Sequence, residues 1–206
     1  MESTRKVQPP APLPDPGSLR RLGLRLFLLS LSVFFAGALF AYLITHLSRS
    51  PVPSARDAVP FAMWVSTLVL LGSGIAMEAS AQFARSARVP QVGKWLKVTI
   101  LLAVGFVFIQ TYCIANLLAQ HEIALANLTL SPELFGLGMF GLMSSLIAIH
   151  AVHVLGGLIP LSFLAARALL DKLGIEQMPM VRGCASYWHF LELVWLAMFG
   201  AFLLTQ

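Results

Sequence analysis

The chain has 206 residues, of which 58% are hydrophobic and only 11% are charged, and its formal net charge is +5. This composition leaves too little polar surface to coat a soluble domain, so it predicts an integral membrane protein. The positive charge does not indicate a nucleic-acid partner, because the basic residues lie in short clusters beside apolar stretches. Cys113 and Cys184 lie in or beside apolar stretches without metal-ligand spacing, which indicates packing residues and neither a disulfide framework nor a zinc site.

The predicted elements are a short tail and five membrane helices. Residues 1–19 hold the prolines between Pro9 and Pro16 and few large apolar side chains, which predicts a disordered, Pro-rich tail. Apolar stretches follow at residues 22–47, 61–83, 95–118, 135–164 and 184–204. Each has the ~20 residues that a helix needs to cross the hydrocarbon core. We therefore expect residues 20–206 to form an all-α bundle of five transmembrane helices.

The flanking charges predict how this bundle is oriented. Of the 14 Lys and Arg residues, all but Arg49 and Arg56 lie in the tail, in the first flank or in the two connections on the same side. The outer connections, residues 48–60 and 119–133, are poor in basic residues. By the positive-inside rule the N-terminus is cytoplasmic and the C-terminus lies outside. The first stretch is too long for a cleavable signal core, so we expect it to be a membrane helix.

Few ionisable side chains fall within the predicted spans. Such groups are costly in lipid unless they face protein or water, so they mark either a polar contact between helices or a functional site. His189 and Glu192 are three residues apart and therefore share one helical face. We expect Glu192, with Trp188 and His189, to hold the last helix against the fourth. The ionisable set is Glu78, His150, His153, His189 and Glu192, with Gln110 as a neutral companion.

Three chemical roles can be compared for these side chains. Haem ligation is disfavoured because His150 and His153 share one face, while His189 lies at another depth. A metal centre is disfavoured because no two helices carry the Glu-x-x-His pattern of di-iron bundles in the required form. A proton path through Glu78 and Glu192 fits better. Both carboxylates lie near the inner surface, however, so they would form only half of a route across the membrane.

Two motifs resemble the cytochrome c oxidase subunit III family. The run Tyr187-Trp188-His189-Phe190-Leu191-Glu192-Leu193-Val194-Trp195 is similar to the Tyr/Phe-Trp-His-Phe-x-Asp-x-Val-Trp signature of that family's last helix. The run His150-Ala151-Val152-His153-Val154-Leu155-Gly156-Gly157 resembles its His-Gly-x-His-Val-x-x-Gly motif on the preceding helix. Weaker similarities, among them Leu70-Leu71-Gly72-Ser73-Gly74, extend the resemblance over all five spans. The family's acid on the first matching helix falls at Leu31, and Glu78 is a candidate to replace it.

The resemblance implies a non-catalytic subunit of a respiratory haem-copper oxidase in a bacterial inner membrane. Such a subunit binds no cofactor of its own, and the haem and copper belong to partner subunits. It would bind subunit I, subunit II and membrane phospholipids, and would support oxygen reduction coupled to proton translocation. The residues expected to form its interhelical polar network or lipid cleft are Glu78, Gln110, His150, His153, Tyr187, Trp188, His189, Glu192 and Trp195.

Three other functions remain open at this point. The accessory subunit of a nitric-oxide reductase shares the five-helix form, and its partner would carry non-haem iron in place of copper. A stand-alone transporter is expected to show inverted repeats and broken helices, which an odd number of continuous spans disfavours. A haem-bearing membrane anchor would show a Soret band in the isolated chain.

Overall fold

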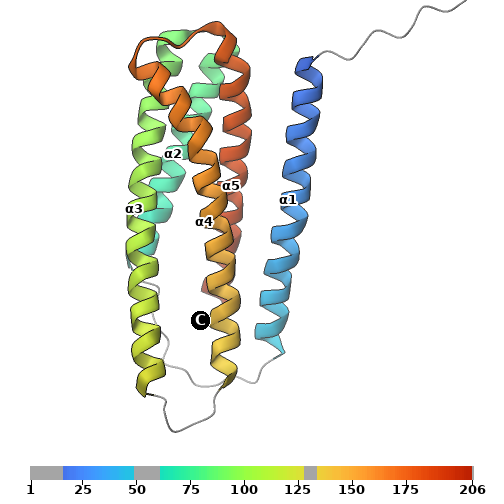
Figure 1. The fold of residues 1–206 in the computed structure, drawn as a ribbon, viewed down its shortest axis with the longest axis vertical. Helices are drawn as coiled ribbons and strands as arrows, with labels where there is room; N and C mark the ends of the chain where they lie inside the picture. The colour runs from blue at the N-terminus through green and yellow to red at the C-terminus, as the bar shows by residue number, and fades with distance from the viewer. Residues whose placement is uncertain (1–15, 49–60, 128–133, 206) are drawn as a thin grey trace, which may run out of the picture.

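The computed structural model describes residues 16–48, 61–127 and 134–205, and shows five long helices (Figure 1). They are α1 (Pro16–Leu47), α2 (Phe61–Arg85), α3 (Val89–Asn127), α4 (Leu134–Leu169) and α5 (Met178–Leu204). The short 3-10 helix η1 (Ile175–Gln177) leads into α5. All five long helices contain a segment that is long and apolar enough to cross a membrane. The predicted all-α, five-helix fold is confirmed.

The helices extend beyond the apolar stretches that predicted them. The first begins at Pro16, so the prediction of a disordered tail is wrong for residues 16–19, while residues 1–15 lie outside the description. Proline suits the first helical position, because its fixed φ is already helical and its missing N–H would be unpaired there anyway. Helix α3 continues to Asn127, so the connection expected at residues 119–133 is helical up to that residue. Hydropathy marks the part of a helix that lies in lipid and does not mark where its hydrogen bonds stop.

Two helices end in the same kind of turn. Ala87 follows α2 and Asp171 follows α4, and each has a φ of 52°, in the left-handed region. The amide of the next residue, Arg88 or Lys172, then donates to a carbonyl five residues back, at 3.1 and 2.8 Å respectively. A left-handed residue followed by this hydrogen bond is the Schellman motif, which closes a helix. Both turns lie at the same end of the bundle (Figure 1).

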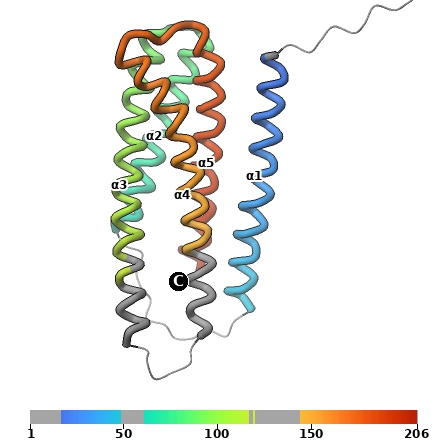
Figure 2. Tube along the Cα trace, viewed as in Figure 1, coloured from blue at the N-terminus to red at the C-terminus, as the bar shows by residue number. Residues whose placement is uncertain are grey.

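Neighbouring helices along the chain run antiparallel, which places the start of α1 at the same end as these two turns (Figure 2). Helices α2 to α5 pack together, and α1 lies to one side, in contact mainly with α4 and α5. Figure 1 shows the last turns of α4 leaning toward α3, and α4 contains Pro160. A proline inside a helix removes a backbone hydrogen bond and is a common cause of such a bend.

The core has two parts. The larger one joins α2, α3, α4 and α5 around fully buried side chains such as Met77, Leu96 and Trp195. The smaller one joins α1 to α4 and α5, and it contains Leu31. Ser66, Ser73 and Ser80, at seven-residue intervals on α2, are fully buried as well. Small residues at such intervals let membrane helices approach closely.

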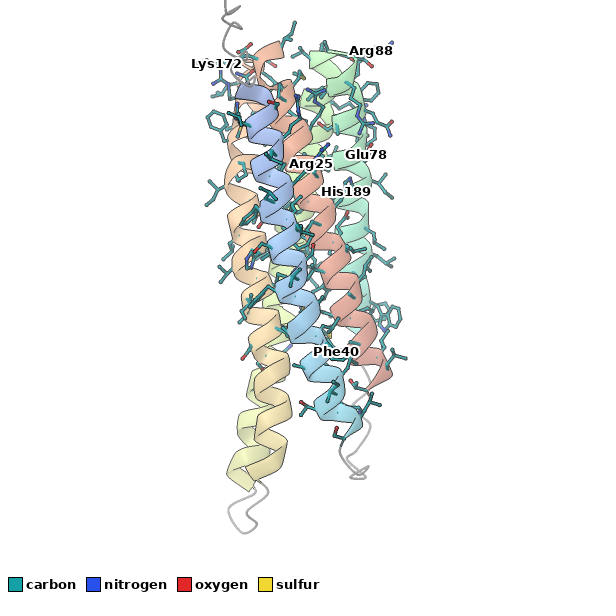
Figure 3. The ribbon with its side chains drawn as sticks, turned by 90° about the vertical axis from the view of Figure 1, so that its right-hand side faces the viewer. Arg25, Phe40, Glu78, Arg88, Lys172 and His189 are labelled. Atoms are coloured by element: carbon teal, nitrogen blue, oxygen red, sulfur yellow. The ribbon has the colours of Figure 1, made fainter. Side chains whose placement is uncertain are left out.

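The topology gathers the described basic residues toward one end of the bundle. Figure 3 shows Arg88 and Lys172 at that end, with Arg25 lower down on α1. Glu78 and His189 lie close together below Arg88. The polar cluster is therefore nearer to the basic end than to the opposite end.

Candidate functional site

The candidate site is a line of polar contacts between α2 and α5, which we call the polar seam. It consists of Thr67, Ser73 and Glu78 on α2 with Trp188, His189, Glu192 and Trp195 on α5. The indole of Trp195 donates to Thr67 Oγ1 at 3.1 Å, and the indole of Trp188 donates to Ser73 Oγ at 3.0 Å. His189 Nε2 lies 3.3 Å from Glu78 Oε2. Because the two helices are antiparallel, these contacts follow one another along the interface.

Each hydroxyl of the seam has two partners. Ser73 Oγ donates to the carbonyl of Leu70 at 2.6 Å, and Thr67 Oγ1 donates to that of Met63 at 2.8 Å. Both oxygens therefore still have lone pairs to accept the indole N–H groups. A buried indole N–H in a membrane bundle needs such an acceptor, because lipid supplies none. The two tryptophans thus join α5 to α2 with no polar atom of theirs left unpaired.

The basic end of the seam is a cluster of carboxylates around one imidazole. His189 Nδ1 lies 2.8 Å from Glu192 Oε2, so the ring stands between Glu192 and Glu78. A neutral imidazole can donate to only one of these carboxylates, whereas a protonated ring can donate to both. Glu78 is also approached by Gln82 Nε2 at 3.4 Å and by Arg85 at 3.6 Å.

The cluster runs from the surface into the bundle. The side chains of His189 and Glu78 are 39% and 36% exposed, but that of Glu192 is only 10% exposed. The three line a surface pocket of about 550 Å³, together with Gly74 and Ile75. Glu192 Oε1 finds no hydrogen-bond partner among the residues that the structure describes.

Gly74 makes room for the buried carboxylate. A Cβ atom at this position would overlap the carboxylate of Glu192, whereas at Gly72 it would meet only Leu102 Cδ1, at 3.6 Å. Sequence reasoning did not identify Gly74, Ser73 or Thr67 as site residues. The stretch 70–74 was part of the family resemblance, but a residue's spacing does not reveal which side chain on another helix it will meet.

The helix to which α5 is joined differs from the prediction. Trp188, His189 and Glu192 were expected to hold α5 against α4, and this is wrong. Trp188 and His189 have their partners on α2, and Glu192 packs against Gly74 of α2. His189 and Glu192, which share one helical face, also contact each other. The polar contact of α5 with α4 comes instead from Tyr187, whose hydroxyl donates to the carbonyl of His153 at 3.0 Å.

Of the remaining predicted residues, Gln110 and His150 line one cavity between α3, α4 and α5, whereas His153 lies outside that lining and packs against Phe35 of α1. Gln110 Oε1 accepts a hydrogen bond from Ser66 at 3.0 Å. The ring of His150 lies against that of Trp195, with 5.6 Å between their centroids. His153 Nδ1 lies 2.7 Å from the carbonyl of Ile149, one turn back on α4.

Two further observations bear on the predicted chemistry. Within the described ranges, no group of three or more His, Cys, Asp or Glu side chains is placed to hold a metal ion. Leu31 belongs to the small cluster of α1, α4 and α5, whereas Glu78 lies in the polar seam. Glu78 therefore does not occupy the place of the family acid that is missing at Leu31.

Comparison with known proteins agrees with the motifs on α4 and α5. The family model of cytochrome c oxidase subunit III matches residues 18–204, which include all five membrane helices. The chain belongs to the cytochrome c oxidase subunit III family. The resemblance predicted from the sequence is confirmed.

Curated relatives of this subunit III chain come from several bacteria. The cytochrome bo(3) ubiquinol oxidase subunit 3 of Pseudomonas putida is 29% identical over 190 residues, covering 90% of this chain and 85% of the relative. A probable cytochrome c oxidase subunit 3 of Mycobacterium leprae is 29% identical, with 86% and 84% covered. The cytochrome c oxidase subunit 3 of Bacillus subtilis is 26% identical, with 89% and 84% covered. These relatives are matched over most of their own length.

Proposed function

We propose that this chain is the non-catalytic subunit III of a haem-copper terminal oxidase in a bacterial inner membrane. The observation that carries the proposal is the family match across residues 18–204, supported by bacterial relatives that are named as oxidase subunits. The described basic residues gather toward one end of the bundle, which supports a cytoplasmic N-terminus under the positive-inside rule. In the assembled enzyme, haem and copper belong to the partner subunits, where oxygen is reduced.

The polar seam gives this subunit its mechanical role. Two buried indole hydrogen bonds and the imidazole–carboxylate cluster join α5 to α2 along much of their length. Interhelical hydrogen bonds of this kind contribute about 0.6–2 kcal/mol each in membrane proteins. The seam therefore keeps the bundle in one shape, against which subunit I and subunit II pack, and so stabilises the complex.

The surface pocket at the basic end of the seam suits a phospholipid. Glu78 and His189 are partly exposed at its wall, and Ile75, which is 72% exposed, continues the wall as an apolar surface. An amine-bearing head group placed against the carboxylates, with an acyl chain along Ile75, would match both parts of the wall. Glu78 lies toward the basic end of the bundle (Figure 3). In the proposed orientation this end is cytoplasmic, where a proton-translocating complex takes up protons.

The experiment is affinity purification of the tagged chain from solubilised native membranes. We expect it to bring down a haem-containing subunit I, with copper found by elemental analysis and a haem spectrum in the eluate. Non-haem iron without copper in the partner would overturn the proposal in favour of a nitric-oxide reductase. A Soret band that stays with the isolated chain would overturn it in favour of a haem-bearing anchor.

The variant Glu192→Leu tests whether the cluster stabilises the complex or contributes to its turnover. Glu192→Leu removes the buried carboxylate of the cluster, so we expect the subunit to dissociate from the complex at lower detergent concentration. Turnover of complexes that remain assembled should change little, because in the proposed complex the haem and copper belong to the partner subunits. An unchanged melting profile with lost turnover would contradict the stabilising role. Leu193→Ala, at a lipid-facing position that is 67% exposed, is the matched control on the same helix.

A further inference from the structure

A second cavity lies within the bundle and shares Trp195 with the polar seam. Its volume is about 110 Å³, and it is enclosed by α3, α4 and α5. Phe106, Val154 and Trp195 form apolar walls, while Gln110 and His150 face it with polar groups. The cavity opens between α3 and α4, where the lining residues Thr111 and Leu155 are exposed at the surface.

Three buried nitrogen atoms at this cavity have no partner in the part of the chain that the structure describes. They are both ring nitrogens of His150 and the amide Nε2 of Gln110. His150 is only 3% exposed and Gln110 only 7% exposed. Leaving one such group unpaired costs about 1–3 kcal/mol, and lipid offers nothing to replace the lost hydrogen bond. Because three such nitrogen atoms lie beside one cavity, we expect the cavity to hold an occupant that forms hydrogen bonds with them.

The available atoms define the chemistry of that occupant. Gln110 Nε2 can only donate, while a neutral imidazole donates from one nitrogen and accepts at the other. The occupant must therefore accept from the amide and also exchange a hydrogen bond with the ring. A neutral hydroxyl group does both. Because no charged side chain lines the cavity, an ionic occupant would be left without a counter-charge.

The volume of the cavity further limits which occupants can fit. An apolar cavity of about 150 Å³ stays dry and admits benzene, whereas a polar cavity is filled by water at about 30 Å³ per molecule. The space here is smaller than the benzene-binding cavity and is polar on one side. It suits a small hydroxyl group better than a ring.

We propose that this cavity is a hydroxyl-binding site within the membrane, where Gln110 and His150 together hold water or the hydroxyl end of a lipid that enters between α3 and α4. The bound hydroxyl links α3 to α4 through hydrogen bonds at a place where the cavity walls are otherwise largely apolar. This site does not depend on the proposed oxidase function.

The test uses the full chain with ¹⁵N-labelled histidine and glutamine, placed in nanodiscs of diacyl phosphatidylcholine, a lipid that has no hydroxyl group. Water-edited solid-state NMR then reports which side-chain nitrogens receive magnetisation from water. If water is the occupant, His150 and Gln110 give signals in these nanodiscs. If a lipid hydroxyl is the occupant, they give none until hydroxyl-bearing lipid is added, which then shifts both resonances. Nitrogens that respond to neither treatment would show a dry cavity and overturn the proposal.

A pair of variants tests whether the NMR response arises from this cavity. His150→Phe keeps a ring beside Phe35 and Trp195 but removes both nitrogens, so the water or lipid response of Gln110 should be lost. His153→Phe, one turn along α4 and outside the cavity lining, should leave that response intact. A response of Gln110 that survives His150→Phe would overturn the joint site. If His150→Phe does not fold, Gln110→Met with His150 as the observed residue gives the same test.

Discussion

Gly74 allows the sharpest test of how the polar seam is built. Its α-carbon lies against the carboxylate of Glu192, so the methyl group of Gly74→Ala would overlap that carboxylate. The carboxylate would have to move, and its contact with His189 Nδ1 would be lost or lengthened. Adding a methyl group to a packed interior typically costs about 1–3 kcal/mol. The helical preference of alanine over glycine offsets about 0.5–1 kcal/mol of this cost, and the carboxylate is the end of a side chain that can move. We therefore expect Gly74→Ala to lower the free energy of unfolding by about 1 kcal/mol net.

Gly72→Ala is the matched control, two residues away on the same helix. Its methyl group would lie 3.6 Å from Leu102 Cδ1, an ordinary van der Waals contact. Replacing glycine by alanine inside a helix is favourable by about 0.5–1 kcal/mol when nothing clashes. The control should be as stable as the parent chain or slightly more stable. Steric-trap unfolding in lipid bicelles measures both variants on one scale.

A double variant identifies the cause of the loss. In a Glu192→Ala background the added methyl group at position 74 has no carboxylate to displace, so its cost should fall by at least 1 kcal/mol. Contacting residues typically show coupling energies of about 0.5–3 kcal/mol. If Gly74→Ala and Gly72→Ala prove equally stable, or if the coupling is zero, then Glu192 does not pack against Gly74 as described.

Three further predictions use the same unfolding measurement. Gly157→Ala should destabilise the chain by about 1–3 kcal/mol, because its methyl group would lie 2.8 Å from Tyr187 Cε1. The control Gly156→Ala should be tolerated, because its methyl group would lie 4.0 Å from the hydroxyl of that tyrosine. Equal losses of stability in the two variants would refute the contact between Gly157 and Tyr187. Trp188→Phe should destabilise the chain by about 1 kcal/mol through the lost hydrogen bond to Ser73, with a further loss because the smaller ring leaves space unfilled. Unchanged stability would argue against the hydrogen bond between Trp188 and Ser73. Ala87→Gly should stabilise the chain by about 1 kcal/mol by relieving its left-handed backbone, and a loss of stability would show that this turn is not left-handed.

The sequence was sufficient to predict the helices, but not which helices pack together. Long apolar runs and the basic flanks determined the number of spans, because lipid allows few other solutions. The spacing of His189 and Glu192 likewise predicted that the two share one helical face, where the structure shows them in contact. Their partner on α2 could not be predicted, because helix periodicity describes the faces of one helix and contains no information about its neighbours. The assignment to α4 failed for this reason.

The cavity at His150 and Gln110 could not be predicted from the sequence for the same reason. Both residues were singled out as costly polar groups in lipid, and both are buried. That they face one space from two different helices follows only from the packing of α3 against α4. The short Schellman turns were not predicted either, because Ala87 and Asp171 occupy a left-handed position that glycine usually takes.

The position of α1 has a consequence for biosynthesis. Only 17% of the most apolar window of α1 is buried, against 44% for α2 and for α5, and its main contacts are with α4 and α5. The ribosome delivers α1 before α2 and α3, and delivers these two partners after them. Helix α1 must therefore wait in the bilayer until α4 and α5 have been inserted before it finds its place, and during that interval its surface is accessible to other membrane proteins.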